Sequence, residues 1–126
     1  VLFRKKSGHK NFVIVDSGMN DLIRPSLYEA HHTIVPVIKH AKKSPRIKCD
    51  IVGPVCETGD FVARERVMPR PNRGEFLAVM GAGAYGFSMS SNYNSRPRAI
   101  EVMVDGGDYR VVKRREKYRD LVRGER

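Results

Sequence analysis

Short runs of alternating hydrophobic and polar residues recur along this 126-residue chain, and such a pattern is typical of β-strands. The clearest run spans residues 46–52. Its apolar members are Ile47, Cys49 and Ile51, and the charged Lys48 and Asp50 stand between them. The alternation predicts a half-buried strand with the apolar side chains facing the core and the two charged ones facing solvent. Strands are also predicted at residues 1–6, 11–16, 33–39, 75–80, 99–104 and 109–114.

Turn-forming residues separate these runs. Residues 7–10 (SGHK) predict a hairpin between the first two strands, and residues 105–108 (DGGD) predict another between the last two. Pro36 interrupts residues 33–39, which indicates an edge strand or a bulge. About seven short strands with little helix predict a mainly β barrel or sandwich that forms a single domain.

Two segments are expected to form short helices. Residues 20–30 suit a helix or turn with Pro25 near its start. Arg24 and Tyr28 are four positions apart in it, so both side chains lie on one helical face and can address the same small anionic ligand. A basic helix is predicted at residues 116–123. Its inward-facing side chains are expected to be Tyr118, Leu121 and Val122.

The charge of the chain limits its partners without choosing among them. There are 24 Lys and Arg against 14 Asp and Glu, a formal net charge of +10, which attracts nucleic acid, anionic lipid or acidic metabolites. The basic residues fall into three patches without a recognised nucleic-acid motif, so we expect a solvated basic surface. Cys49 and Cys56 lack the closely paired ligands of a zinc site, which argues against a metal. No apolar run approaches the roughly 20 residues that cross a bilayer, so a reducing, soluble compartment is expected.

Candidate chemistry gathers in two segments that do not fit a core. Residues 83–98 are crowded with Gly, Ser, Asn and Tyr, so we expect them to face a ligand or another surface. Residues 56–60 (CETGD) follow a predicted strand end, where functional groups are often displayed. The Cys56 thiol suits a general acid because the reference thiol pKa is about 8.5, although a small buried hydrophobe is the alternative. Glu57 alone suggests an exposed loop carboxylate, and Tyr85 a tyrosine packed over a glycine-rich turn.

Three motifs together carry a family resemblance: residues 24–28 (RPSLY), residues 56–60 and residues 83–98. In order and spacing they closely resemble the C-terminal domain of diaminopimelate decarboxylase. The resemblance implies a two-domain enzyme whose N-terminal (β/α)8 barrel carries the lysine that anchors pyridoxal 5'-phosphate. Residues 1–126 then form one β domain of the alanine racemase-like decarboxylases, without that barrel. We expect such a fragment to be inactive alone.

The resemblance also assigns roles to individual residues. It implies that Cys56 returns a proton to the substrate carbon after CO2 leaves, and that Glu57 holds the ammonium at the far end of meso-2,6-diaminopimelate. Arg24 and Tyr28 match substrate-contacting positions, and Tyr85 matches a residue that lines the cofactor pocket and contacts substrate. The implied enzyme is a homodimer in which Cys56 and Glu57 reach into the partner's active site, and its product is L-lysine.

Two alternatives stay open beside this assignment. Ornithine-type decarboxylases of the same fold carry aspartate after the cysteine, so Glu57 favours the diaminopimelate branch over an ornithine or arginine decarboxylase. A non-catalytic basic binding module is the second alternative. Arg96 and Arg98 also match the family and are interpreted as structural or interface residues. The resemblance implies a cytoplasmic enzyme, or a plastid one in a plant, with no membrane partner.

Overall fold

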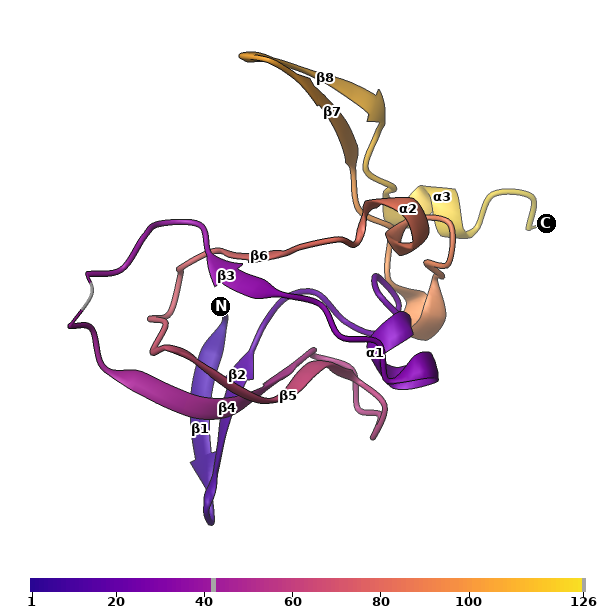
Figure 1. Cartoon of the computed structure of the whole chain (residues 1–126). Helices are drawn as coiled ribbons and strands as arrows, with labels where there is room; N and C mark the ends of the chain where they lie inside the picture. Colours follow the sequence, from indigo (N-terminus) through magenta and orange to yellow (C-terminus); the bar gives the residue numbers. More distant parts are fainter. Residues whose placement is uncertain (42, 126) are drawn as a thin grey trace.

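The computed structural model describes residues 1–41 and 43–125, which contain eight strands and four short helical segments (Figure 1). Four strands form the main sheet, in the order β1-β2-β4-β5. They are β1 (Phe3–Ser7), β2 (Lys10–Ile14), β4 (Arg46–Val52) and β5 (Phe61–Pro69). β2 and β4 are parallel, whereas the other neighbours are antiparallel. The sheet is therefore built on a hairpin and a longer antiparallel pair.

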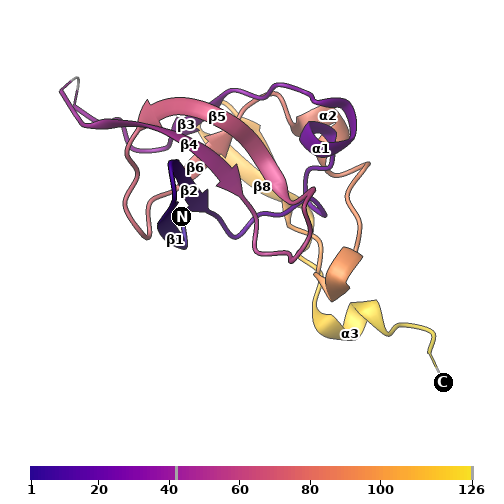
Figure 2. The ribbon, with the colours of Figure 1, turned by 90° about the horizontal axis from the view of Figure 1, so that it is seen from below.

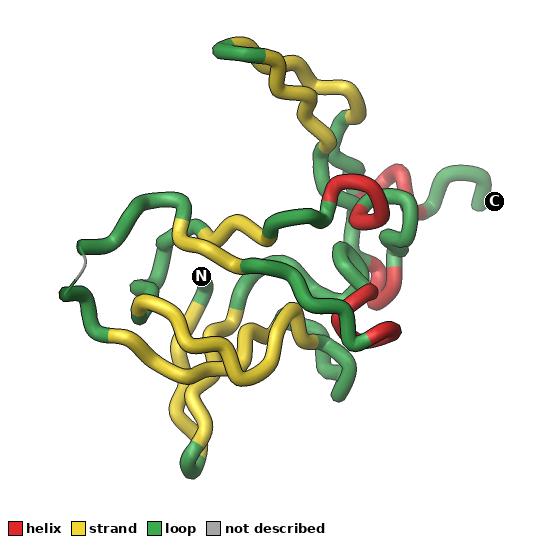
Figure 3. The backbone as a smooth tube through the Cα atoms, in the orientation of Figure 1, coloured by secondary structure: helices red, strands yellow, loops and turns green. Residues whose placement is uncertain are grey.

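A two-stranded ribbon covers one face of this sheet and closes the core. It consists of β3 (Ile34–Pro36) and β6 (Leu77–Val79), which pair antiparallel. Ile34, Leu77 and Val79 pack against the buried cluster of the main sheet. Figure 3 shows the ribbon and the sheet as separate yellow layers. The buried cluster consists of Val13, Val15, Leu22, Cys49, Ile51, Val62, Ala63 and Met68.

A third pair of strands stands apart from the sandwich. β7 (Glu101–Asp105) and β8 (Asp108–Lys113) form an antiparallel hairpin that projects from the domain (Figure 1). Its base contacts the domain where the Lys113 ammonium lies 3.8 Å from the centroid of the Phe87 ring. One face of the hairpin is apolar and exposed. The side chains on that face are Val102, Val104, Tyr109 and Val111.

The helical segments are short and lie toward the C-terminal side of the domain. α1 (Arg24–Tyr28) begins at Arg24 and has Pro25 in its first turn, where the fixed φ of proline is suitable. α2 (Gly83–Gly86) and the 3₁₀ turn η1 (Tyr93–Ser95) lie in the glycine-rich run. α3 (Tyr118–Leu121) extends with the C-terminus away from the sheets, as Figure 2 shows. In the described part of the chain, no helix has the length and apolar content that a bilayer crossing requires.

The mainly β prediction is confirmed, because each of the seven predicted strands overlaps an observed one. The strand missed was β5, whose alternation is broken by a bulge at Glu65, where φ is +55°. The backbone N–H of Glu65 donates to Asp50 Oδ1 at 2.7 Å. The prediction that Asp50 faces solvent was therefore wrong: its carboxylate is buried because it satisfies the bulge.

The inward face predicted for the C-terminal helix was wrong for Tyr118 and Val122, whereas Leu121 is half-buried. Tyr118 is 75% exposed and Val122 is exposed as well. The helix is held instead by Asp120, whose carboxylate accepts hydrogen bonds from the Lys117 backbone N–H at 2.8 Å and from Arg114. Polar capping therefore fixes this turn while Tyr118 and Val122 stay exposed.

Candidate functional site

The loop between β4 and β5 carries Cys56 and Glu57, and a buried carboxylate fixes its shape. Asp60 is only 4% exposed, and its Oδ2 accepts a hydrogen bond from the Val55 N–H at 2.6 Å. Its Oδ1 accepts another from the Met19 N–H, also at 2.6 Å. A Cβ at Gly53 would overlap this carboxylate, so the close approach requires glycine. Asp60 therefore ties the loop to the segment that precedes α1.

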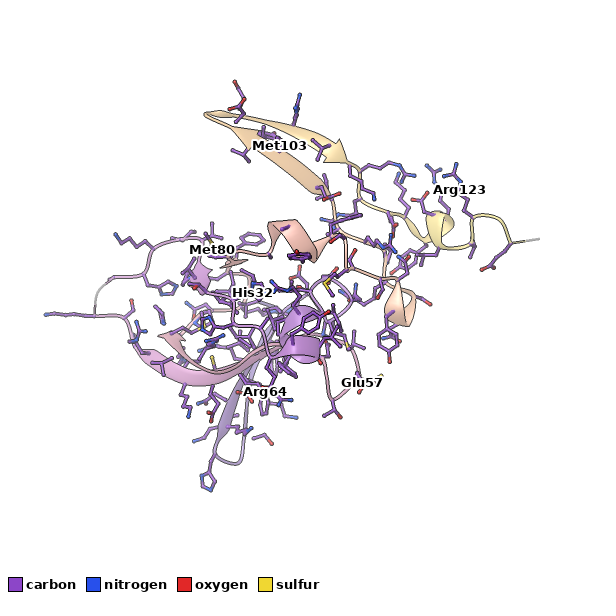
Figure 4. All side chains as sticks on the ribbon, turned by 45° about the vertical axis from the view of Figure 1, so that its right-hand side comes forward. His32, Glu57, Arg64, Met80, Met103 and Arg123 are labelled. Atoms are coloured by element: carbon purple, nitrogen blue, oxygen red, sulfur yellow. The ribbon has the colours of Figure 1, made fainter. Side chains whose placement is uncertain are left out.

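The same loop packs directly against α1. A Cβ at Gly59 would lie 2.7 Å from Ser26 Oγ, so the Gly59 backbone lies directly against the Ser26 side chain. The loop turns tightly, since the Glu57 N–H donates to the Val55 carbonyl at 2.9 Å and the Asp60 N–H donates to the Glu57 carbonyl at 3.0 Å. Figure 4 shows Glu57 on the outer side of the domain, below α1. The turn thus displays its polar side chains to the exterior.

The two cysteines occupy opposite environments. Cys56 is exposed in this loop, so the alternative that it is a small buried hydrophobe does not hold. Cys49 lies in the core, where burial and the neighbouring Asp50 carboxylate raise the pKa of its thiol to about 11. Of the two thiols, Cys56 is therefore the one placed to exchange a proton with a ligand.

Arg24 and Tyr85 come together although 61 positions separate them in the chain. The guanidinium carbon of Arg24, at the start of α1, lies 5.2 Å from the centroid of the Tyr85 ring in α2. This cation–π contact holds the guanidinium in place and leaves its N–H donors for an anionic ligand. Tyr85 is 56% exposed, so one side of the pair remains accessible.

Glu57 is joined to the glycine-rich run by a residue that the sequence analysis did not single out. Its Oε2 accepts a hydrogen bond from the Tyr93 hydroxyl at 3.4 Å, and its Oε1 accepts one from the Thr58 N–H at 2.8 Å. Tyr93 lies in η1 and is half exposed. Its only sequence signal was membership of a run that is poor in core residues.

The five predicted site residues are thus brought together in part. Arg24 contacts Tyr85, and Glu57 contacts Tyr93 of the same run. Tyr28 is exposed at the end of α1, on the helix that the Cys56 loop packs against. Among the described residues, no hydrogen bond or ion pair links Tyr28 or Cys56 to the other three. Asp60, which shapes the loop, was not predicted as a functional residue.

Arg96 anchors the glycine-rich run to the segment before α1. Its Nε donates to Asn20 Oδ1 at 2.9 Å, and its terminal nitrogen donates to the Asp16 carbonyl. Asn20 is buried, and its carbonyl accepts a hydrogen bond from the Ser91 N–H at 2.9 Å. These contacts support the structural interpretation of Arg96.

A second clamp holds the end of the run. The Glu116 carboxylate accepts hydrogen bonds from the Arg98 N–H at 2.8 Å and from the Asn92 amide at 2.7 Å. These bonds, the backbone one first, lower the pKa of Glu116 below its ordinary value. The second half of the run, which carries Tyr93, is therefore held by two sets of hydrogen bonds.

Two open hollows flank α1. The larger, about 490 Å³, lies between α1 and β5 and is lined by Ser26, Thr58 and Arg66 among others. The smaller, about 350 Å³, is lined by Met19, Asn20, Ile23, Met89, Ser91 and Tyr93. Tyr93 also contacts Glu57, so the smaller hollow adjoins the predicted chemistry. In the described part of the chain, no three His, Cys, Asp or Glu side chains gather as metal ligands do.

Comparison with known proteins assigns the family. The sequence profile of the C-terminal sheet domain of pyridoxal-dependent decarboxylases matches residues 1–83, well over half of the chain. The chain belongs to this family. It is 55% identical over 122 residues to a diaminopimelate decarboxylase of Aquifex aeolicus, covering 97% of this chain and 29% of that protein. This sheet domain therefore spans less than a third of the relative's length.

Solved structures agree with the family and with the mainly β fold. The sheet domain matches a crystal structure from Aquifex aeolicus with a TM-score of 0.93 and 54% identity, over 98% of this chain and 30% of that one. It matches a diaminopimelate decarboxylase from Helicobacter pylori, complexed with L-lysine, with a TM-score of 0.88 and 45% identity, over 98% and 29%. A lysine/ornithine decarboxylase from Vibrio vulnificus has a TM-score of 0.67 and 19% identity, which shows a shared fold alone.

The family implies pyridoxal 5'-phosphate, and the Tyr85 region fits a contact with it. The Tyr85 hydroxyl makes no hydrogen bond to another described residue, and its ring is more than half exposed. A free phenol donor suits a phosphate oxygen, and the adjacent Arg24 adds positive charge. The accessible Tyr85 hydroxyl and the neighbouring Arg24 guanidinium are thus chemically compatible with a phosphate group.

Proposed function

We propose that this chain is the C-terminal domain of a diaminopimelate decarboxylase, which converts meso-2,6-diaminopimelate to L-lysine and CO2. The observation that carries this proposal is the exposed Cys56-Glu57 turn. Asp60 holds its backbone through the Val55 N–H, and the Tyr93 hydroxyl contacts its Glu57 carboxylate. High identity to a diaminopimelate decarboxylase supports it. The cofactor lysine and the barrel belong to the rest of a two-domain polypeptide, since this chain spans only 29% of that relative.

The substrate is recognised by opposite charges on neighbouring elements. Diaminopimelate has an amino-acid head at both ends, so an enzyme that reads the distal head needs a cation for its carboxylate and an anion for its ammonium. Arg24 supplies the first, and a guanidinium binds a carboxylate with two parallel hydrogen bonds. Glu57 supplies the second, and Tyr28 lies on the same helix as Arg24. An amino acid with one head leaves one of these charges unpaired.

Cys56 acts as the general acid. When it is bound, pyridoxal phosphate withdraws electrons from the substrate carbon that loses CO2. Cys56 then delivers the proton of its Sγ to that carbon, which becomes the methylene that carries the side-chain amino group of L-lysine. An exposed thiol at the tip of a fixed turn suits this task because a ligand can reach its Sγ–H.

The active enzyme is proposed to be a cytoplasmic homodimer in which this turn completes the partner's active site. Cys56 and Glu57 face outward, away from the core of their own domain. The apolar face of the β7-β8 hairpin is also exposed, and a two-stranded hairpin is marginal in water unless it packs against something. Both features support a domain that works inside a larger assembly.

Substrate competition on the intact enzyme tests the proposal. The enzyme is expected to release CO2 from meso-diaminopimelate in preference to ornithine and arginine. Glu57→Asp shortens the anion by one methylene, so it should lower the kcat/KM ratio of diaminopimelate to ornithine by about tenfold. Glu125→Asp, an exposed change near the C-terminus, is the matched control. Preferred turnover of ornithine, or an unchanged ratio in Glu57→Asp, would refute the assignment.

A further inference from the structure

We propose that Tyr93 is a positioning residue that orients the Glu57 carboxylate and thereby sets selectivity for a two-headed substrate. The role rests on the proposed function, because it acts through the anion that binds the distal ammonium. Tyr93 itself is none of the five residues that the resemblance assigns to substrate binding or proton transfer. Its contact with Glu57 links η1 to the β4-β5 turn, two segments 36 positions apart.

The geometry divides the two carboxylate oxygens between different partners. Oε1 accepts the Thr58 N–H at 2.8 Å, within the turn itself. Oε2 accepts the Tyr93 hydroxyl at 3.4 Å, from another segment. The first bond lies within the turn, whereas the second, longer contact links the carboxylate to another segment and favours one orientation of the side chain. Each oxygen keeps acceptor capacity, so an ammonium can still bind.

Hydrogen bonds also fix the backbone around Tyr93. Its backbone N–H donates to Ser91 Oγ at 3.2 Å, and the next residue, Asn94, adopts a left-handed conformation with φ of +59°. The Ser91 N–H donates to the backbone carbonyl of buried Asn20, and the side-chain Oδ1 of Asn20 accepts a hydrogen bond from Arg96 Nε. The backbone that carries the Tyr93 ring is therefore tied to the segment before α1, the same segment that Asp60 ties to the loop.

The Tyr93 ring has a second function that follows from its place in the smaller hollow. Its neighbours there include the apolar side chains of Met19, Ile23 and Met89. One residue thus combines an apolar wall with the hydroxyl that contacts Glu57. A phenylalanine keeps the wall and loses only the hydroxyl, so Tyr93→Phe isolates the proposed orienting bond.

A double-mutant cycle on the intact enzyme tests this role. Tyr93→Phe, Glu57→Gln and the double variant are compared by steady-state kinetics with meso-diaminopimelate. Loss of the orienting bond weakens binding in ground and transition states alike, so Tyr93→Phe should raise KM about fivefold and keep kcat within about twofold. In the Glu57→Gln background it should change KM by less than about twofold. The control is Tyr118→Phe, since Tyr118 is 75% exposed and makes no hydrogen bond to another described side chain.

The outcomes separate this role from the proposed function. If Glu57→Gln raises KM but Tyr93→Phe multiplies KM equally in both backgrounds, Tyr93 acts elsewhere and only the positioning role fails. If Glu57→Gln leaves KM for meso-diaminopimelate unchanged, the distal-ammonium assignment fails and the positioning role falls with it. A crystal structure of Tyr93→Phe gives a further readout, in which Glu57 should occupy more than one rotamer. A single unchanged rotamer would contradict the role.

Discussion

Replacement of Asp60 by asparagine should destabilise the domain more than any other near-isosteric change in the loop. Each oxygen of the buried carboxylate accepts one backbone N–H at 2.6 Å, from Met19 or from Val55. In asparagine one oxygen becomes an NH2 group, which places a donor against a donor. Hydrogen bonds to charged groups contribute about 1.5–3 kcal/mol, and an unsatisfied buried donor adds to the loss, so we expect about 3 kcal/mol.

Urea unfolding of the 126-residue chain measures this loss. With a slope of about 1.5 kcal/mol/M for a domain of this size, Asp60→Asn should lower the midpoint by about 2 M. Hydrogen exchange at the Met19 and Val55 amides should accelerate together. Asp16→Asn is the control, because Asp16 is exposed and its carboxylate contacts no other described residue by a hydrogen bond. A midpoint within about 0.3 M of wild type in Asp60→Asn would refute the role given to this carboxylate.

Three further results are expected. Iodoacetamide at pH 8 should alkylate the exposed Cys56 in the folded chain. Cys49 should react only in denaturant, because burial raises the pKa of its thiol to about 11. Equal alkylation rates of the two cysteines, measured by mass spectrometry, would contradict this expectation. Gly53→Ala should cost several kcal/mol in urea unfolding because its Cβ would overlap Asp60, whereas Gly107→Ala, with nothing within 4 Å, should cost less than about 0.5 kcal/mol. The pKa of the Glu116 carboxylate, measured by NMR, should lie below the ordinary Glu pKa. The hydrogen bonds that it accepts from the glycine-rich run should therefore be fully present above the ordinary pKa and be lost as the pH falls through the lowered pKa. A pKa at or above the ordinary value would contradict these hydrogen bonds.

Local pattern was enough to predict most strands, and it failed where a side chain serves the backbone. Residues 46–52 alternate cleanly and form β4 with the predicted bounds. β5 was not predicted because Glu65 lies in a bulge with positive φ. The bulge interrupts the alternation of apolar and polar residues that identifies a strand. Asp50 looked like a solvent-facing charge, and its burial follows from that bulge. The bulge in β5 and the buried carboxylate in β4 depend on each other, so neither can be predicted from the sequence of one strand alone.

The candidate site was predictable as motifs and not as contacts. The Cys56-Glu57 turn was assigned to a displayed loop, and it is one. The sequence did not predict the role of Asp60, because its hydrogen-bond partner Met19 lies 41 positions away. It did not predict the role of Tyr93 either, because its partner Glu57 lies 36 positions away. The inward face expected for Tyr118 failed for a different reason: helical spacing identifies an apolar face but does not say whether anything covers it.

The central claim is that the β4-β5 turn binds the distal ammonium of meso-diaminopimelate and returns a proton to its reacting carbon. The most direct test is steady-state CO2 release from meso-diaminopimelate by the intact enzyme that carries Cys56→Ala or Glu57→Gln. Removal of a general acid lowers kcat by about 10²–10⁴-fold, so Cys56→Ala should reduce kcat by at least 100-fold with KM nearly unchanged. Glu57→Gln should instead act mainly on KM. Wild-type kcat in Cys56→Ala together with wild-type KM in Glu57→Gln would contradict the claim.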